Sequence, residues 1–352
     1  MALPETTTVN VHKAFYDSIN YKSYLQTTGQ SKTGCGWSYT LKTTTCGKNR
    51  HINPYLLVWA FVGFADLSAT AEESQMPQNC RNAGTTITLA PKGETLLVGF
   101  MGQLWWWSLD NGKAELSNRL QISGCDPQFS PDGKQIVFQR YLSDQWDIWK
   151  LDVENGTQRA LTTAPYNDLE PTYTLDGSII FVSDRTGNFD VWSLNPISNE
   201  LSLLISQTGN ASFPNVSDRG DLAYVSQDGD AWIVRVLPAQ GRLVDAYTSR
   251  HPLGAPSWRP GGGAILFSET TTNPQKNDLK LLIFADKPAQ KDIEIPSSVA
   301  GPRIAWISSA EFLYTANGSI WRRGLTNTES SPVILQVNDQ VKIRAPFQNN
   351  GL

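Results

Sequence analysis

The side chains that most often carry out catalysis are scarce in this chain. Its 352 residues include three histidines, His12, His51 and His251, and no pair of them has the spacing of a zinc site. A serine hydrolase needs a nucleophile in a sharp turn such as Gly-x-Ser-x-Gly, with a histidine as base, and no such pentad occurs. We therefore expect neither a metal hydrolase nor a serine hydrolase within these residues.

Recognition of a partner is the chemistry that the remaining polar side chains suit. Eight of them lie in loops that lead into the first strand of a repeat unit described below, and their mixed charges fit a peptide or another polar ligand. They are Asp126, Tyr166, Asp168, Glu170, Asn210, Arg250, His251 and Arg303. The alternative is that these residues form an ordinary solvated rim. No metal ligand and no cofactor is predicted.

The elements that would position these residues come from an internal repeat. A polar residue, an aliphatic residue and a tryptophan recur at intervals of about 43 residues. The triplets are residues 103–105, 147–149, 190–192, 230–232 and 319–321, and residues 278–280 fill the remaining slot with lysine in place of tryptophan. A period of roughly 40–45 residues with four short strands per unit is typical of a propeller blade. Six units predict an all-β fold, a six-bladed β-propeller of four-stranded antiparallel blades.

Each unit divides into four strands separated by turns. In the second unit the strands are residues 127–129, 136–138, 147–149 and 159–161. Asp132-Gly133, between the first two strands, supplies the positive φ that a tight hairpin turn needs. In the sixth unit the predicted fourth strand is residues 333–335. The repeated tryptophans are expected to fill the wedge between blades, and Trp106 is the candidate exception because alternation places it on the opposite face from its two neighbours.

The second and third units are similar to a known repeat. Residues 129–133, Phe-Ser-Pro-Asp-Gly, residues 183–187, Ser-Asp-Arg-Thr-Gly, and residues 190–192, Asp-Val-Trp, resemble the TolB-like, WD-type propeller repeat. The similarity extends over roughly residues 84–340. The resemblance implies a six-bladed propeller that is commonly periplasmic and is used for protein contacts or is fused to a hydrolase.

The residues before the repeats carry an export pattern. Residues 1–50 are rich in Thr, Ser and Gly, with six basic residues against two acidic ones, and we expect them to be disordered. In residues 51–71, a basic flank precedes a ten-residue apolar run and a small-x-small tripeptide at 69–71. This layout is typical of a secretory signal, and the run is too short to span a bilayer. The alternative is a buried strand or helix. Because a signal stands at the N-terminus and fifty residues precede this one, the signal interpretation places the true translation start near residue 52. A start at Met1 would favour an internal hydrophobic patch without export.

These observations predict one order of segments. They are a disordered extension (1–50), a signal peptide (51–71), a linker (72–84), the propeller (85–340) and a C-terminal tail or truncated linker (341–352). The mature protein would be periplasmic or secreted, monomeric and without a membrane span. Its net charge of −4 disfavours nucleic acid as a partner.

Three functional hypotheses follow. The first is an exported, non-catalytic scaffold that binds a protein or peptide at the mouth of its central channel. The second is an N-terminal substrate-gating propeller of an amidohydrolase, or of a prolyl-oligopeptidase or tricorn-like peptidase, whose catalytic domain would follow Leu352. The third is a lectin-like propeller with exposed tryptophans. Cys80 and Cys125 would be the two cysteines of the mature chain, for which a disulfide is open and a free buried pair is the favoured interpretation.

Overall fold

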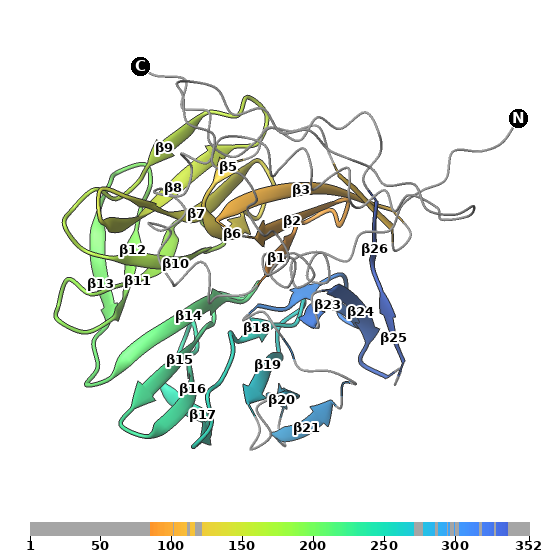
Figure 1. The fold of residues 1–352 in the computed structure, drawn as a ribbon. Helices are drawn as coiled ribbons and strands as arrows, with labels where there is room; N and C mark the ends of the chain where they lie inside the picture. Colours follow the sequence, from red (N-terminus) through yellow and green to blue (C-terminus); the bar gives the residue numbers. More distant parts are fainter. Residues whose placement is uncertain are drawn as a thin grey trace, which may run out of the picture.

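The computed structural model describes residues 85–336, apart from residues 101, 111–112, 117–121, 271–276, 286–287, 294, 296–298, 300–302, 317–318 and 327–328. The described residues form strands and turns, and no helix occurs among them. The strands make six sheets arranged around a central axis (Figure 1). This architecture confirms the predicted all-β, six-bladed propeller. The predicted extension, signal peptide, linker and tail lie outside the described residues.

Within each blade, consecutive strands pair antiparallel from the axis outward. Blade 1 holds β1 (Thr86–Leu89), β2 (Thr95–Phe100), β3 (Gln103–Asp110) and β4 (Lys113–Leu116), with β5 (Ile122–Ser123) also paired to β3. Blade 2 holds β6 (Cys125–Phe129), β7 (Gln135–Leu142), β8 (Gln145–Asp152) and β9 (Gln158–Ala160). Blade 3 holds β10 (Asp168–Tyr173), β11 (Ile179–Ser183), β12 (Asp190–Leu194) and β13 (Leu201–Ile205).

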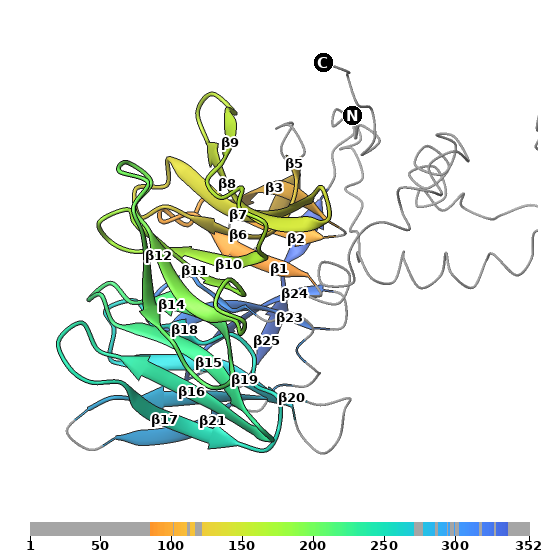
Figure 2. The ribbon, with the colours of Figure 1, turned by 90° about the vertical axis from the view of Figure 1, so that its left-hand side faces the viewer.

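The second half of the ring follows the same order. Blade 4 holds β14 (Asn210–Val216), β15 (Leu222–Asp228), β16 (Ala231–Leu237) and β17 (Val244–Ser249). Blade 5 holds β18 (Ser257–Trp258), β19 (Ala264–Thr270), β20 (Asn277–Ile283) and β21 (Ala289–Ile293). Blade 6 holds β22 (Ala305–Trp306), β23 (Glu311–Ala316), β24 (Ser319–Gly324) and β25 (Ser330–Pro332). The first strands contact one another around the axis in the order β22, β1, β6, β10, β14 and β18, and Figure 2 shows the sheets stacked side by side.

The hydrophobic core lies between the blades, because both faces of each sheet are covered by its neighbours. In blade 2, Ile136 and Phe138 pack toward blade 1, whereas Val137 packs toward blade 3, and all three are fully buried. Trp149 and Trp192 lie at the margins of these two clusters, as the packing hypothesis requires. A strand buried on both faces reads as a continuous apolar run, which is why strand two of each blade is so apolar.

Trp106 is not an exception to this packing. It is 4% exposed and meets Phe129 of blade 2 edge to face, with ring centroids 6.2 Å apart. Its neighbour Trp107 points the other way, into the cluster between blades 1 and 6. The alternation of the strand was predicted correctly, but both of its faces are buried, so the hypothesis that Trp106 is an exception to the packing between blades is wrong.

The ring is closed by the last described strand. The sixth unit's fourth strand is β25, whereas β26 (Ile334–Gln336) leaves that blade and runs from β25 toward β3 in Figure 1. β26 pairs parallel with β4 of blade 1. The prediction of a fourth strand at residues 333–335 was therefore wrong. The physical reason is that β4 would otherwise present an unpaired outer edge at the seam of the ring, and β26 supplies its missing hydrogen bonds.

Cys125, the first residue of β6, is disulfide-bonded and 4% exposed. The favoured interpretation of a free buried thiol was wrong for this residue. The other three cysteines of the sequence, Cys35, Cys46 and Cys80, lie outside the described residues.

Candidate functional site

One repeat position on the innermost strands brings six residues together around the axis. In each blade, the last residue of strand one that pairs with strand two serves as the reference. The repeat position lies three residues before it. From blade 1 to blade 6 it is occupied by Thr86, Asp126, Glu170, Phe213, Ala255 and Arg303. Three of the eight predicted site residues thus share one structural position.

A proline shapes this position in blades 2, 3 and 4. Asp126, Glu170 and Phe213 each precede a proline, and each has a positive φ of 52–56°. The pairing register of strand one shifts at the same place in all three blades. Proline has no N–H to donate to the ladder, so the strand bulges there, and a bulge redirects a side chain. Here the charged side chains of blades 2 and 3 meet Arg303 of blade 6 and the Phe213 backbone.

Asp126 and Arg303 form a buried ion pair. The Arg303 Nε donates to Oδ1 of Asp126 over 2.6 Å, and a second guanidinium nitrogen donates to Oδ2 over 2.9 Å. Both residues are 4% exposed. Two parallel hydrogen bonds between guanidinium and carboxylate make one of the stronger ion pairs found in proteins, and this one joins blade 6 to blade 2.

Glu170 lies beside this pair. Its carboxylate accepts a hydrogen bond from the Phe213 backbone N–H, and its own backbone N–H donates to Oε1 of Gln139 over 2.7 Å. Burial, with a contribution from the negative charge of Asp126, raises the pKa of Glu170 to about 7. The hydrogen bond from Phe213 and the charge of Arg303 act in the opposite direction. We call Asp126, Glu170 and Arg303 the channel core.

A second ring of residues lies two positions further along each innermost strand. It consists of Thr88, Gln128, Thr172, Asn215, Ser257 and Ala305, so five of its six members carry a hydroxyl or an amide. These residues line two adjoining cavities of about 150 and 260 Å³ that share Thr88, Gln128 and Asn215. The smaller cavity reaches Arg303, and the larger is bounded by the turns between strands one and two at residues 130–131 and 174–175. We call the two cavities the funnel.

The funnel opens at the end of the ring opposite the predicted mouth. From the sequence, the mouth was expected at the loops that lead into strand one. Asp126 instead lies in β6, and Asp168 and Glu170 lie in β10. The long charged side chains of the channel core occupy the axis at this end of the ring. The shorter polar residues two positions on leave space. This ring was not among the residues predicted from the sequence, although in blades 2, 3 and 4 it lies one residue after the proline of each X-Pro pair.

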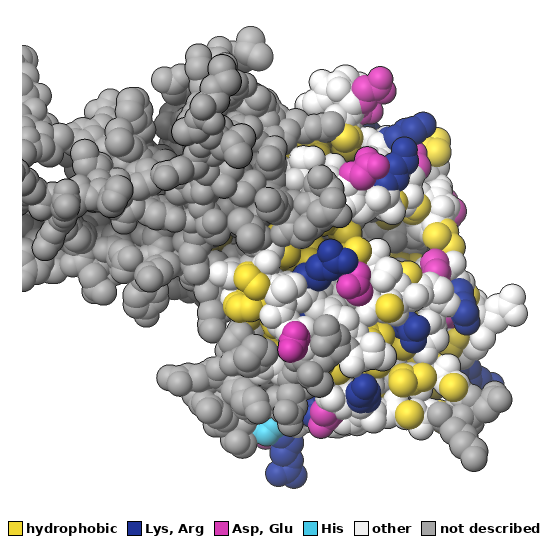
Figure 3. Space-filling view, turned by 90° about the vertical axis from the view of Figure 1, so that its right-hand side faces the viewer, with side chains coloured by type: hydrophobic (Ala, Val, Ile, Leu, Met, Phe, Trp, Pro, Cys, Tyr) yellow, Lys and Arg dark blue, Asp and Glu magenta, His cyan; other side chains and the backbone are white. Residues whose placement is uncertain are grey.

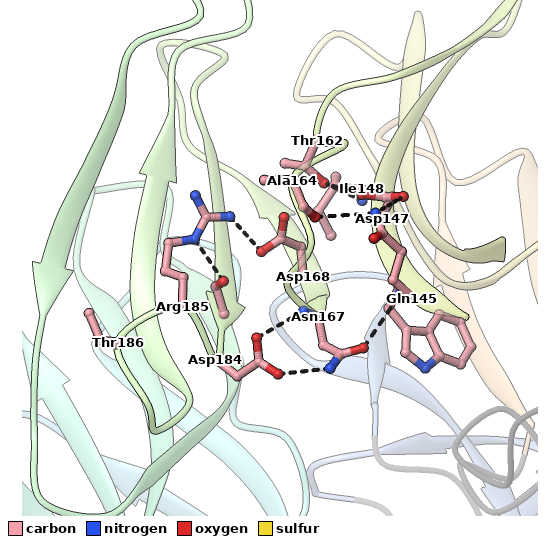
Figure 4. Close-up of polar contacts among 12 residues, drawn as sticks. Gln145, Asp147, Ile148, Thr162, Ala164, Asn167, Asp168, Asp184, Arg185 and Thr186 are labelled. Atoms are coloured by element: carbon pink, nitrogen blue, oxygen red, sulfur yellow. Dashed lines mark hydrogen bonds and ion pairs between the residues drawn. The ribbon is translucent and has the colours of Figure 1, made fainter. Parts of the chain in front are cut away.

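Asp168 lies in a group of polar contacts at the boundary of blades 2 and 3 (Figure 4), and Tyr166 stands two residues before it in the loop that leads into β10. Asp168 is completely buried and accepts a hydrogen bond from Arg185 over 2.7 Å. The Arg185 guanidinium lies over the rings of Trp192, at 4.9 Å, and Tyr166, at 5.4 Å, and its Nε donates to Ser183. Tyr166 is 39% exposed and accessible to a binding partner, whereas the buried Asp168 is not. Arg185 therefore fixes the loop that leads into β10.

Asn210, Arg250 and His251 do not join the channel core. Asn210 is exposed, and its side-chain oxygen accepts a hydrogen bond from the Phe189 backbone over 3.1 Å. Arg250 is exposed and His251 half-buried in the loop between β17 and β18. Among the described residues that Figure 3 shows, basic and acidic side chains are interspersed with hydrophobic ones.

The described residues show two further features of the site. They contain no group of three or more His, Cys, Asp or Glu placed to hold a metal ion. The channel core offers a guanidinium and two carboxylates, and the funnel offers neutral donors and acceptors. This arrangement can hold a polar ligand by hydrogen bonds and charge.

Comparison with known sequences identifies the family. Residues 101–299 match the family model of the TolB beta propeller domain. This chain belongs to that family. Among solved structures, TolB from Acinetobacter baumannii has a TM-score of 0.55 and 20% identity, covering 63% of this chain and 57% of that chain. At 20% identity, the similarity between this chain and the TolB structure establishes a shared fold alone.

Two curated relatives match part of the TolB-type propeller. An uncharacterized protein of Agrobacterium fabrum, Atu1656, is 26% identical over 153 residues, which is 40% of this chain and 52% of that protein. The uncharacterized peptidase YuxL of Bacillus subtilis is 21% identical over 174 residues, 49% of this chain and 26% of that protein. The chain spans about half or less of the length of these relatives. Among the described residues, we find no helical segment with the length and apolar character that a bilayer crossing requires.

Proposed function

We propose that this TolB-type propeller is an exported, non-catalytic scaffold that holds a segment of a protein or peptide in its funnel. The observation that carries the proposal is the ring of Thr88, Gln128, Thr172, Asn215 and Ser257 around two adjoining cavities, of which the smaller reaches Arg303. Hydroxyl and amide groups pair with the backbone N–H and C=O groups of an extended chain, and a few convergent polar groups give a pocket its specificity.

The size of the funnel supports a short segment as the ligand. Its cavities of about 150 and 260 Å³ approach the roughly 300–1,000 Å³ of ligand pockets, so they suit a few residues and not a folded domain. The accessible residues at the other end, Tyr166, Asn210, Arg250 and His251, stay candidates for a second contact with the same partner.

Export belongs to this proposal and rests on the charge and hydropathy pattern of residues 51–71. N-terminal sequencing of periplasmic or secreted protein is expected to begin at Glu72. Intact Met1 on cytoplasmic protein would contradict it.

The experiment that tests binding compares variants as baits in cell-envelope extract, with captured proteins quantified by mass spectrometry. Gln128→Trp and Thr172→Trp fill the funnel and should reduce the capture of the partner at least tenfold. The matched control is Glu154→Trp, in the exposed turn between β8 and β9. Equal capture by all three variants would refute the funnel as the site. Loss of capture only in Arg250→Ala with His251→Ala would move the site to the other end.

A second candidate function is a substrate-gating propeller of a larger hydrolase. The observation that favours it is the match to YuxL, of which this chain resembles 26%. Reading the gene beyond the codon for Leu352 in all three frames decides between the two. A serine-nucleophile or metal-binding domain there would support the hydrolase.

A further inference from the structure

The channel core carries an unbalanced set of charges. It holds two carboxylates and one guanidinium, and both hydrogen bonds from Arg303 go to Asp126. The described contact of the Glu170 carboxylate is the neutral Phe213 N–H. A buried carboxylate without a cation of its own costs free energy, so the neutral, protonated form of Glu170 is favoured in the channel core.

The groups that face Glu170 come from four other elements. They are Asp126 on β6, Gln139 on β7, the Phe213 N–H on β14, and Arg303 just ahead of β22. Asp126 and Arg303 are the charged members of this set, and they already neutralise each other. The site therefore joins blades 2, 3, 4 and 6, and its net charge depends on the proton of Glu170.

We propose that the channel core is a proton-controlled lock, in which a protonated Glu170 holds the inner strands of the four blades together and loss of the proton loosens them. With the proton bound, the core is neutral overall. Without it, a second carboxylate charge faces Asp126, and both compete for Arg303. Positive φ at Asp126, Glu170 and Phe213 adds backbone strain at the same position.

The direction of the effect follows from the two states of the glutamate. Its pKa is about 7 in the folded protein against 4.5 as the ordinary value. The folded protein thus binds the Glu170 proton more tightly than the unfolded chain does. The stabilisation of the folded state is therefore complete below pH 4.5 and is lost as the pH rises to about 7. Because Arg303 also borders the funnel, a ligand there would meet a core whose charge changes with pH, and this consequence alone rests on the proposed function.

Urea denaturation of the wild type and of Glu170→Gln between pH 5 and pH 8, followed by tryptophan fluorescence, tests the lock. In the wild type this one group should raise the unfolding equilibrium constant on the order of a hundredfold from pH 5 to pH 8. The neutral amide of Glu170→Gln should remove that part of the dependence. The control Glu200→Gln, in the exposed turn before β13, should keep it. Equal pH dependence in wild type and Glu170→Gln would overturn the proposal.

A second measurement covers the case in which Glu170→Gln does not fold. The amide resonance of Phe213, followed in wild-type protein labelled with ¹⁵N-phenylalanine, reports on the carboxylate that accepts its hydrogen bond. A shift with a midpoint near pH 7 supports the lock. A midpoint near pH 4.5, or no shift between pH 5 and pH 8, contradicts it.

Discussion

Arg303 of blade 6 and Asp126 of blade 2 lie 177 residues apart in the sequence and form a buried ion pair with hydrogen bonds of 2.6 and 2.9 Å. The pair passes blade 1, where the smaller Thr86 occupies the equivalent position. Blade 1 is also where β26 closes the ring on β4. The seam is thus secured twice, by a strand pairing at its outer edge and by an ion pair at the axis.

Removal of one partner of this pair should be strongly destabilising. Asp126→Ala leaves the Arg303 guanidinium buried without its carboxylate, which typically costs about 3–5 kcal/mol of the free energy of unfolding. The double variant Asp126→Leu with Arg303→Met leaves no uncompensated charge, so it should lose much less. Urea denaturation of the single and double variants measures both. A cost below about 1 kcal/mol for Asp126→Ala would show that the pair does not hold the ring.

Arg185 should be equally sensitive, because it is the partner of a fully buried carboxylate. Arg185→Ala leaves Asp168 unpaired and uncovers Trp192, and we expect a loss of about 3 kcal/mol or more. Arg185→Lys keeps the charge but not the planar group over the ring, so it should recover part of the stability. The matched control is Arg159→Ala. The guanidinium of Arg159 is exposed and contacts the backbone of Pro196, so its removal should change the free energy of unfolding by less than about 0.5 kcal/mol. Thermal or urea unfolding at one pH distinguishes them, and equal losses for Arg185→Ala and Arg159→Ala would contradict the assignment.

The disulfide of Cys125 should contribute to stability. Bonds of this kind typically stabilise a protein by about 2–4 kcal/mol, because they restrict the unfolded chain. A phosphine reductant should therefore lower the urea midpoint of the wild type. The variant Cys125→Ser should have a lower midpoint from the outset and no response to the reductant. An unchanged wild-type midpoint after complete reduction would show that the bond carries no stability.

The parts of the fold that depend on local pattern were predictable from the sequence. The predicted fourth strand of the second unit, residues 159–161, overlaps β9, and the tryptophan triplets lie in the third strands or overlap them. A hairpin's signals lie within a few residues of each other, so one unit suffices to place its strands. β26 was assigned to the wrong blade because its partner β4 precedes it by more than 200 residues, and a parallel pairing over that distance leaves no local pattern.

The sequence named the residues of the channel core, but neither their arrangement nor the polar ring of the funnel. Asp126, Glu170 and Arg303 were all among the predicted residues, yet their burial depends on the strand bulge at each X-Pro pair and on contacts between blades 2, 3, 4 and 6. The sequence shows the proline but not the register shift that follows from it. Gln128 and Asn215 were missed because alternate polar residues on a short strand also read as an ordinary solvated face.

The most direct test of the account is a photoreactive amino acid placed in the funnel in living cells. It replaces Gln128 in one variant and Glu154, on the exposed turn outside the funnel, in the control. We predict a covalent adduct with a segment of one partner protein or peptide at position 128, identified by mass spectrometry, and none above background at position 154. The same low yield of adduct at both positions, in cells that export the protein, would contradict the claim that the funnel of this propeller is its binding site.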